Sequence, residues 1–340
     1  MSALTLSVIA IVSTAIVWKG SELLDRSSQR LGLYYGLPAV VQGAVIVAIG
    51  SSFPELASVV LAVLRHGTFD LGVGTIVGSA IFNILVIPAL SALRSSPLSV
   101  NRDVVYKEGQ FYMLAIAVLL LTFSFGVIYN TGGSGAVSVI GRPLALIPIG
   151  MYVLYLFIQY QDVHDYDPPV ESPQDSVGRE WLRLAAGLVL IVIAVEGLIH
   201  AALGFGELFD SPEFIWGLTI VAAGTSFPDA FVSVRAAGRG DGEVSVANVL
   251  GSNTFDLLVA LPVGVLLIGS TVVNYALAVP MMGVLTLATV VLFTAMRTNL
   301  EISRREAWVL LGCYGLFICW IILETAGTIS TLPPVQPGID

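Results

Sequence analysis

The chain has 340 residues, of which 56% are hydrophobic and only 11% charged, and its mean hydropathy is +0.89. Soluble domains carry about 25% charged residues, so this composition excludes a soluble protein and predicts an integral membrane protein surrounded by the lipid bilayer. The net charge of −9 excludes nucleic acid as a partner, because binding to nucleic acid requires a basic surface.

Apolar stretches long enough to cross a bilayer recur along the whole chain, since about 20 residues suffice for a transmembrane helix. We predict ten spans, at about 3–24, 37–64, 69–93, 109–129, 143–161, 181–203, 213–236, 243–268, 271–295 and 307–326. The longest polar stretch, 161–180, divides them into five and five. The sequence therefore predicts an all-α membrane protein with a first five-helix repeat (1–160), a short linker (161–180), a second five-helix repeat (181–326) and a tail (327–340).

Lys and Arg are distributed unequally between the two sets of loops. If the N-terminus is external, the loops that face the cytoplasm hold twelve of the fifteen basic residues, and the opposite loops hold only Arg65 and Arg142. Cytoplasmic loops of membrane proteins are enriched in basic residues. We therefore predict that both termini are extracellular and that the linker 161–180 is cytoplasmic.

A polar motif inside the second span returns in the seventh. Residues 50–55 read Gly-Ser-Ser-Phe-Pro-Glu and residues 224–229 read Gly-Thr-Ser-Phe-Pro-Asp, at an offset of 174. In the next spans, residues 78–83 read Gly-Ser-Ala-Ile-Phe-Asn and residues 251–256 read Gly-Ser-Asn-Thr-Phe-Asp, at an offset of 173. Because each half has an odd number of spans, the two copies enter the membrane from opposite sides. The sequence therefore predicts an inverted-topology repeat, as in many secondary transporters.

The repeated motifs contain groups that bind hard cations. A carboxylate inside a membrane span is costly and marks a functional site, and Glu55 and Asp229 stand at equivalent positions. The proline before each acid removes a backbone donor, so we expect both helices to be interrupted there. Carboxylate, hydroxyl and freed carbonyl oxygens suit Na⁺ and Ca²⁺. Folding the inverted halves together would bring Glu55, Asp229, Asp256 and Asn83 to one site at the middle of the membrane.

The two motif pairs resemble the alpha-repeats of the cation/Ca²⁺ exchanger superfamily, specifically the Na⁺/Ca²⁺ exchangers, over residues 43–83 and 217–256. The resemblance implies a secondary antiporter that exchanges Na⁺ for Ca²⁺ by alternating access, with the first and sixth spans sliding as a gating pair. It implies that Glu55 and Asp229 are the central Ca²⁺ ligands and also serve Na⁺. The remaining ion ligands that it implies are oxygens of Ser51, Ser52, Thr225, Ser226, Ser79, Ser252, Asn83, Asp256, Ala48 and Ala222.

The second repeat departs from the prokaryotic pattern in ways that leave the transported ions open. Asp229 stands where many prokaryotic members carry Glu, and Ala80 replaces an Asn common there. The combination of Pro-Asp with Phe-Asp resembles the K⁺-dependent branch, which is expected to use the position of Asp256 for K⁺. Co-transport of K⁺ therefore stays open. So does exchange of Ca²⁺ for H⁺, and so does antiport of another divalent cation.

Several polar residues have a structural alternative. Serine and threonine hydroxyls in the motifs often bond the backbone of their own helix. The charged side chains of Lys19, Glu22, Glu196 and His200 are interpreted as snorkelling or end-of-span groups, and His66 as a loop residue. For the buried acids, the alternative is a structural ion pair with a basic side chain.

Gly238-Arg-Gly-Asp241 superficially matches the G-x-G-D motif of an intramembrane aspartyl protease, with Tyr166-Asp167 as its partner. Both segments lie in polar turns and not at membrane depth, which argues against proteolysis. We expect a transporter and no enzyme, working as a monomer in a prokaryotic cell membrane, with Na⁺, Ca²⁺ and in one alternative K⁺ as cargo and no bound cofactor.

Overall fold

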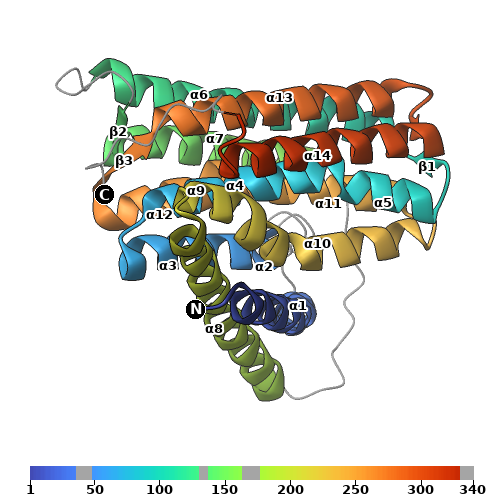
Figure 1. The fold of residues 1–340 in the computed structure, drawn as a ribbon. Helices are drawn as coiled ribbons and strands as arrows, with labels where there is room; N and C mark the ends of the chain where they lie inside the picture. The colour runs from blue at the N-terminus through green and yellow to red at the C-terminus, as the bar shows by residue number, and fades with distance from the viewer. Residues whose placement is uncertain (36–47, 130–136, 163–176, 330–340) are drawn as a thin grey trace.

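The computed structural model describes residues 1–35, 48–129, 137–162 and 177–329, and most of them are helical (Figure 1). The helices are α1 (Ala3–Tyr34), α2 (Ala48–Ser51), α3 (Phe53–His66), α4 (Phe69–Leu85), α5 (Ile87–Arg94), α6 (Gly109–Tyr129), α7 (Arg142–Asp162), α8 (Val177–Phe209), α9 (Glu213–Trp216), α10 (Ala222–Ala237), α11 (Gly242–Phe255), α12 (Leu261–Ile268), α13 (Tyr275–Arg297) and α14 (Arg304–Thr325). Three π-helical turns adjoin them: η2 (Val104–Glu108), η3 (Gly217–Val221) and η4 (Asp256–Ala260). Four short strands complete the fold: β1 (Leu98–Ser99), β2 (Val137–Gly141), β3 (Ser270–Asn274) and β4 (Glu301–Ile302).

Nine helical segments within the described ranges are long and apolar enough to cross a membrane, and they correspond to nine of the ten predicted spans. The remaining predicted span, 37–64, begins outside the described residues, and its described part forms α2 and α3. The predicted linker 161–180 and tail 327–340 lie largely outside the described residues as well. The prediction of a many-helix membrane protein is confirmed.

Two helices, α1 and α8, extend well beyond their predicted bounds of 3–24 and 181–203. They have 32 and 33 residues respectively. α1 continues because the polar side chains of its C-terminal turns find partners within the helix. The Arg26 guanidinium donates to Glu22 Oε1 at 2.6 Å, and Gln29 Nε2 donates to Asp25 Oδ1 at 2.9 Å. The apolar run therefore marked the part of the helix suited to the bilayer and not the end of the helix.

Two small antiparallel sheets connect the helices of this otherwise all-α fold. Residues Ser270–Asn274 form β3, so the helix of the ninth predicted span, 271–295, begins only at Tyr275. The segment contains Thr271, Val272 and Val273, and β-branched residues favour strands. Asn274 Oδ1 then caps α13 by accepting a hydrogen bond from the Leu277 N–H at 3.3 Å.

The same two sheets show the inverted relation between the halves. β1 follows α5 and pairs with β4, which precedes α14. In the other direction, β3 follows α12 and pairs with β2, which precedes α7. Figure 1 places the two sheets at opposite ends of the helices. Each connection therefore occurs once at each end of the molecule, as an inverted-topology repeat requires.

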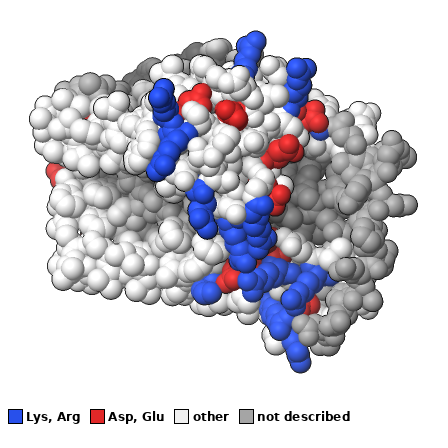
Figure 2. Space-filling model, turned by 90° about the vertical axis from the view of Figure 1, so that its right-hand side faces the viewer, with Lys and Arg blue, Asp and Glu red and all other residues white. Residues whose placement is uncertain are grey.

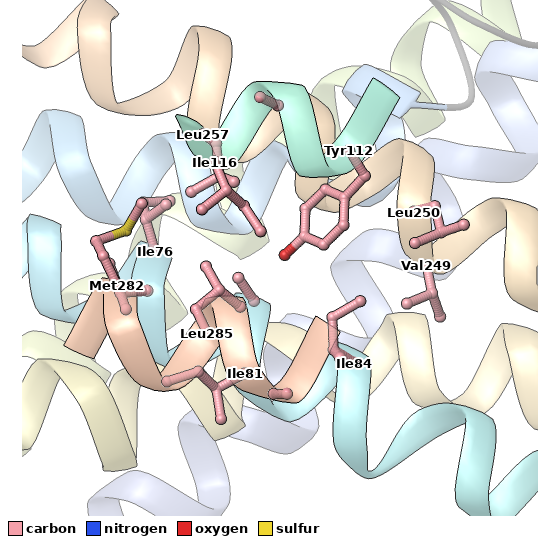
Figure 3. Packing of buried hydrophobic residues seen from close by; sticks show 14 of the residues in the cluster. Ile76, Ile81, Ile84, Tyr112, Ile116, Val249, Leu250, Leu257, Met282 and Leu285 are labelled. Carbon is pink, nitrogen blue, oxygen red and sulfur yellow. The ribbon is translucent and has the colours of Figure 1, made fainter. Parts of the chain in front are cut away.

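Buried apolar side chains form one large cluster and one smaller cluster. The large cluster fills the space between the core helices. Figure 3 shows part of it: Ile76, Ile81 and Ile84 of α4, Tyr112 and Ile116 of α6, Val249 and Leu250 of α11, Leu257 of η4, and Met282 and Leu285 of α13. The smaller cluster joins α1 and α8 to each other and to α3, α4 and η3.

Helices α1 and α8 cross on one side of the core helices (Figure 1). They approach backbone to backbone at Gly20 and Gly187. A Cβ atom on Gly20 would lie 2.7 Å from Ile191 Cγ1, and one on Gly187 would lie 2.9 Å from the Gly20 carbonyl oxygen. Small residues permit such close helix packing within a membrane. The first and sixth spans, predicted to be a gating pair, therefore pack against each other as a pair.

Candidate cation-binding site

Glycines hold α4 of the first repeat directly against the second repeat. A Cβ atom on Gly74 would lie 2.3 Å from the Phe214 carbonyl oxygen, and one on Gly78 only 2.1 Å from that of Leu218. No side chain fits at these distances, so only glycine allows this contact. The contact places Ser79 and Asn83 of α4 beside the Gly-Thr-Ser-Phe-Pro-Asp motif of the second repeat.

The predicted helix interruption occurs in one repeat and not in the other. In the first repeat α2 ends at Ser51 and α3 begins at Phe53, with Pro54 in its first turn. In the second repeat α10 runs without a break through Pro228, so the prediction is wrong there. The irregular turn lies before the motif instead, as the π-helical turn η3. Proline deprives only the Gly224 carbonyl of its helical partner, and one lost hydrogen bond can be tolerated where neighbouring helices pack closely.

Glu55 is completely buried and is bonded by hydroxyl groups from both repeats. Ser79 Oγ and Ser226 Oγ each donate to Glu55 Oε1 at 3.4 Å, and the two serine oxygens lie 2.7 Å apart. Ser79 belongs to α4 and Ser226 to α10. The acid of the first repeat is thus held at the contact between the two halves, as the sequence predicted.

Asp229 is almost equally buried, with an exposed fraction of 1%, and is bonded by the amide of Asn83. Asn83 Nδ2 donates to Asp229 Oδ2 at 3.4 Å and to Asn253 Oδ1 at 3.0 Å. Asn253 Nδ2 in turn donates to the Ala80 carbonyl at 3.2 Å and to the Tyr112 hydroxyl at 3.1 Å. A chain of amides therefore links the second acid to α4 and α6.

Three further serines that the resemblance implied as ion ligands also lie close together. Ser51 Oγ and Ser252 Oγ lie 3.1 Å apart, and Ser52 Oγ donates to the Ser252 carbonyl at 3.4 Å. Ser252 lies beside Asp229, and Ser52 lies beside Asp256. Ser52, which lies between α2 and α3, therefore extends the cluster toward the third acid.

Thr225 follows the structural alternative in part. Its hydroxyl lies beside Glu55 but donates to carbonyls of its own helix, those of Val221 at 3.1 Å and Ala222 at 3.2 Å. The Ala222 carbonyl, an implied ligand, already accepts this bond. Its counterpart Ala48 begins α2, directly after residues that lie outside the described part of the chain.

Five buried oxygen atoms of this cluster have no hydrogen-bond partner among the described residues. They are Glu55 Oε2, Asn83 Oδ1, Asp229 Oδ1 and both carboxylate oxygens of Asp256. No Lys, Arg or His of the described ranges forms an ion pair with any of the three acids. A structural ion pair, the alternative for these acids, is therefore not formed there. Buried charge without a partner is costly, so the cluster is arranged for a ligand that supplies positive charge.

The charges of Glu55, Asp229 and Asp256 interact with one another, and the expectation that these acids and Asn83 share one site stays a prediction. Within the described residues, no three acidic, histidine or cysteine side chains lie together in metal-binding geometry. Serine hydroxyls donate to Glu55 and the Asn83 amide donates to Asp229. Any bound cation would therefore combine one or two carboxylates with neutral oxygens.

A cavity of about 490 Å³ opens to the surface between α1, α10 and α11 and reaches this cluster. Ser51 and Asp229 form part of its wall at the inner end. Glu22, Arg26 and Arg239 also line it. Asp229 is therefore the acid of the cluster that faces a path to solvent, whereas Glu55 is not part of the wall.

Sequence reasoning missed Asn253 and Tyr112. Asn253 stands at the position equivalent to Ala80, so the repeat alignment contained a signal for it: an Asn present in one copy where the other has Ala. Tyr112 is completely buried in α6, and nothing in its apolar surroundings in the sequence singled it out. Glu196, interpreted as a snorkelling or end-of-span group, pairs with Arg65 and His66 at the C-terminal end of α3.

Comparisons with known proteins show what this chain is similar to. The family described as "Sodium/calcium exchanger protein" matches residues 5–161 and 180–323. The chain is 31% identical over 273 residues to the putative antiporter CaxA of Alkalimonas amylolytica, covering 76% of this chain and 81% of that protein. It is 26% identical over 344 residues to the sodium/calcium exchanger MaX1 of Methanosarcina acetivorans, covering 91% and 96%.

A solved structure shows the same fold. The sodium-calcium exchanger NCX_Mj, soaked with Na⁺ and Sr²⁺, matches with a TM-score of 0.59 at 24% identity, covering 94% of this chain and 99% of that chain. The family match spans both repeats and therefore most of the chain. The chain belongs to the sodium/calcium exchanger family.

Proposed function

We propose that this protein exchanges Na⁺ for Ca²⁺ across a membrane by alternating access. The observation that carries the proposal is the set of five buried oxygens without a hydrogen-bond partner in the described residues, arranged around three acids that no basic side chain neutralises there. A permanent cationic partner would fix the charge in place, whereas a transported cation supplies it only while bound. The printed names of two relatives, a sodium/calcium exchanger and a putative antiporter, support the same function.

The neighbours of each acid suggest how the ions divide between them. Ca²⁺ takes about six to eight hard oxygen ligands. Glu55 and Asp229, with the hydroxyls of Ser79 and Ser226, offer the central carboxylate and hydroxyl oxygens for it. Na⁺ carries half the charge and needs fewer carboxylates. The groups assigned to it are the oxygens of Ser51, Ser52, Ser252, Thr225, Asn83 and Asp256 and the carbonyls of Ala48 and Ala222, together with the two central acids.

Basic side chains suggest which side of the membrane the cavity faces. Lys and Arg gather in a band on the face that holds β1 and the C-terminal ends of α5 and α10 (Figures 1 and 2). Arg26, Arg235 and Arg239 line the cavity that opens there. By the enrichment of basic residues on the cytoplasmic side, this state is open to the cytoplasm, and both termini are extracellular. We place the protein in a prokaryotic cell membrane and take the single chain as the working unit.

Asp256 is the residue on which the proposal of K⁺ co-transport depends. Three carboxylates formally balance one Ca²⁺ and one K⁺, and both Asp256 oxygens are without a hydrogen-bond partner among the described residues. The position equivalent to Asp256 in the first repeat holds the neutral Asn83. A monovalent cation beside Asp256 would balance the negative charge that Asp256 carries and Asn83 does not. K⁺ co-transport therefore belongs to the proposal as its second part.

The deciding experiment uses purified protein in liposomes loaded with Na⁺. Dilution into Na⁺-free buffer imposes an outward Na⁺ gradient, and uptake of radioactive Ca²⁺ is measured with and without K⁺. We expect uptake that requires the gradient and that disappears when a Na⁺ ionophore collapses it. Uptake driven equally well by a pH gradient in Na⁺-free buffer would instead identify a Ca²⁺/H⁺ exchanger.

A further inference from the structure

An ion pair joins the gating helix α8 to the core at the end of the molecule opposite the basic face. Glu196 Oε1 lies 3.1 Å from Arg65 Nε and 3.1 Å from His66 Nε2. Arg65 and His66 form the last turn of α3, whose C-terminal end points away from the end that holds β1 (Figure 1). The pair therefore holds α8 against the core on the side where, in this state, the cavity does not open.

The inverted repeat assigns this pair a counterpart at the other end. The offset of 174 that relates Gly50 to Gly224 also relates Glu22 of α1 to Glu196, and Arg65 to Arg239 after α10. Each pair thus combines a glutamate of one gating helix with an arginine that ends a core helix of the other repeat. The two glutamate side chains are similarly exposed, at 26% for Glu22 and 24% for Glu196.

The counterpart ion pair, between Glu22 and Arg239, is not formed in this structure. Glu22 accepts from Lys19 at 2.9 Å and from Arg26 at 2.6 Å, both on its own helix. Arg239 forms no ion pair with any residue of the described ranges. Glu22 and Arg239 instead both line the cavity that reaches Asp229. One end of the molecule is therefore held by its glutamate–arginine pair, while the equivalent pair at the other end is separated around the open path.

We propose that Glu196–Arg65 and Glu22–Arg239 are alternating latches that determine which side of the membrane reaches the cation site. The inference rests on the proposed alternating access. When the two repeats exchange conformations, each contact passes to its symmetry-related counterpart. Closing the cavity brings Glu22 to Arg239, and opening the opposite side separates Glu196 from Arg65. These four residues do not touch the transported ion and act by positioning α1 and α8.

The two latches differ in strength because their surroundings are not symmetric. The outer latch has a second partner in His66, whose counterpart is Gly240. The inner glutamate has Lys19 and Arg26 as competing partners, and their counterparts on α8 are Ile193 and His200. The outer latch should therefore be the more stable one. A protein without bound ions should rest open toward the basic face, the state seen here.

A reporter cysteine in the cavity tests this directly. Ala236 lines the cavity, so Ala236→Cys, in a background with Cys313 and Cys319 replaced by Ser, reports by its labelling rate with a polar maleimide how often the cavity is open. We expect Glu196→Gln to lower this rate by about fivefold or more, within the range of typical coupling free energies. The matched variant Glu22→Gln should leave the rate equal to that of the parent or raise it. Equal rates in the parent and in Glu196→Gln would overturn the proposal.

A second measurement keeps the test valid if Glu196→Gln is merely unstable. In the same cysteine-free background, Glu22→Cys with Arg239→Cys should form a disulfide under mild oxidation, detected by mass spectrometry, although the two positions are separated in this structure. Failure of this pair to cross-link while Arg65→Cys with Glu196→Cys does cross-link would contradict the inner latch. Labelling and cross-linking do not depend on which ions are carried. If the variants change the accessibility of the cavity in a protein that shows no Na⁺-driven Ca²⁺ uptake, the proposed function is rejected. The proposal of two alternating latches is then still supported.

Discussion

The two copies of the repeated motif have nearly the same sequence but different surroundings. Glu55 follows a helix break and accepts hydrogen bonds from two serine hydroxyls, one from each repeat. Asp229 lies in an unbroken helix, accepts a hydrogen bond from the Asn83 amide and lines the open cavity. From this difference we expect the two acids to divide the work. Asp229 should receive a cation from the cavity, and Glu55 should hold it at the contact between the halves.

The largest effect should come from removing either charge. Glu55→Gln and Asp229→Asn keep the shape of the side chain but leave the cation without its principal counter-charge. We expect each to lower Na⁺-driven Ca²⁺ uptake by roughly 100-fold or more, the factor that corresponds to about 3 kcal/mol for an unpaired buried charge. The control Glu213→Gln removes an exposed carboxylate and should transport normally.

Unequal losses in these two variants would revise the comparison. If Asp229→Asn keeps near-normal flux while Glu55→Gln does not, Asp229 belongs to the entry path and is not a central ligand. Size-exclusion chromatography and thermal unfolding in detergent show whether each variant is folded. A folded Glu55→Gln with normal flux would remove Glu55 from the site altogether.

Much of this site could be predicted from the sequence, because the feature that costs the most free energy, a carboxylate inside an apolar segment, is visible there. A carboxylate in an apolar run, repeated at a fixed offset with glycine, hydroxyl and proline neighbours, predicts a buried oxygen site without any coordinates. The structure brings Glu55, Ser79 and Ser226 together as expected, and likewise Asp229 with Asn83. The inverted order of the spans also predicted that residues of both halves would meet.

The features that could not be predicted from the sequence depend on local backbone geometry and on contacts between residues far apart in the chain. A proline predicts one lost hydrogen bond, but whether the helix breaks there or a π-helical turn forms nearby depends on the packing of neighbouring helices. The pairing of Glu196 with Arg65 joins residues 131 positions apart, which no local pattern reveals. Asn253 shows the opposite case: the signal lay in the comparison of the repeats, as an asymmetry opposite Ala80.

A smaller effect should follow when the motif at residues 251–256 is made like its counterpart at residues 78–83. Asp256→Asn gives the second repeat the side chain that Asn83 provides in the first and removes one of three buried charges. We expect the parent to exchange faster with K⁺ than without it, and Asp256→Asn to lose this difference while retaining exchange. Uptake rates over a series of K⁺ concentrations measure it. A parent that is indifferent to K⁺ would show that the asymmetry between Asp256 and Asn83 serves Na⁺ or packing instead.

The smallest effect is expected from a change of Asn253, whose amide links the two repeats without a hydrogen bond to Glu55 or Asp229. Its amide bonds Asn83, the Ala80 carbonyl and Tyr112, so Asn253→Ala leaves buried polar groups of α4 and α6 without their partner. We expect a loss of about 1–3 kcal/mol in stability, seen as a lower thermal midpoint in detergent, with Ca²⁺ uptake reduced much less than in the acid variants. The neighbouring Thr254 is as deeply buried, but its hydroxyl donates only to the Leu250 carbonyl of its own helix. Thr254→Val should therefore leave the midpoint nearly unchanged, and an equal drop in both variants would show that any polar loss in α11 destabilises the helix, whatever it links.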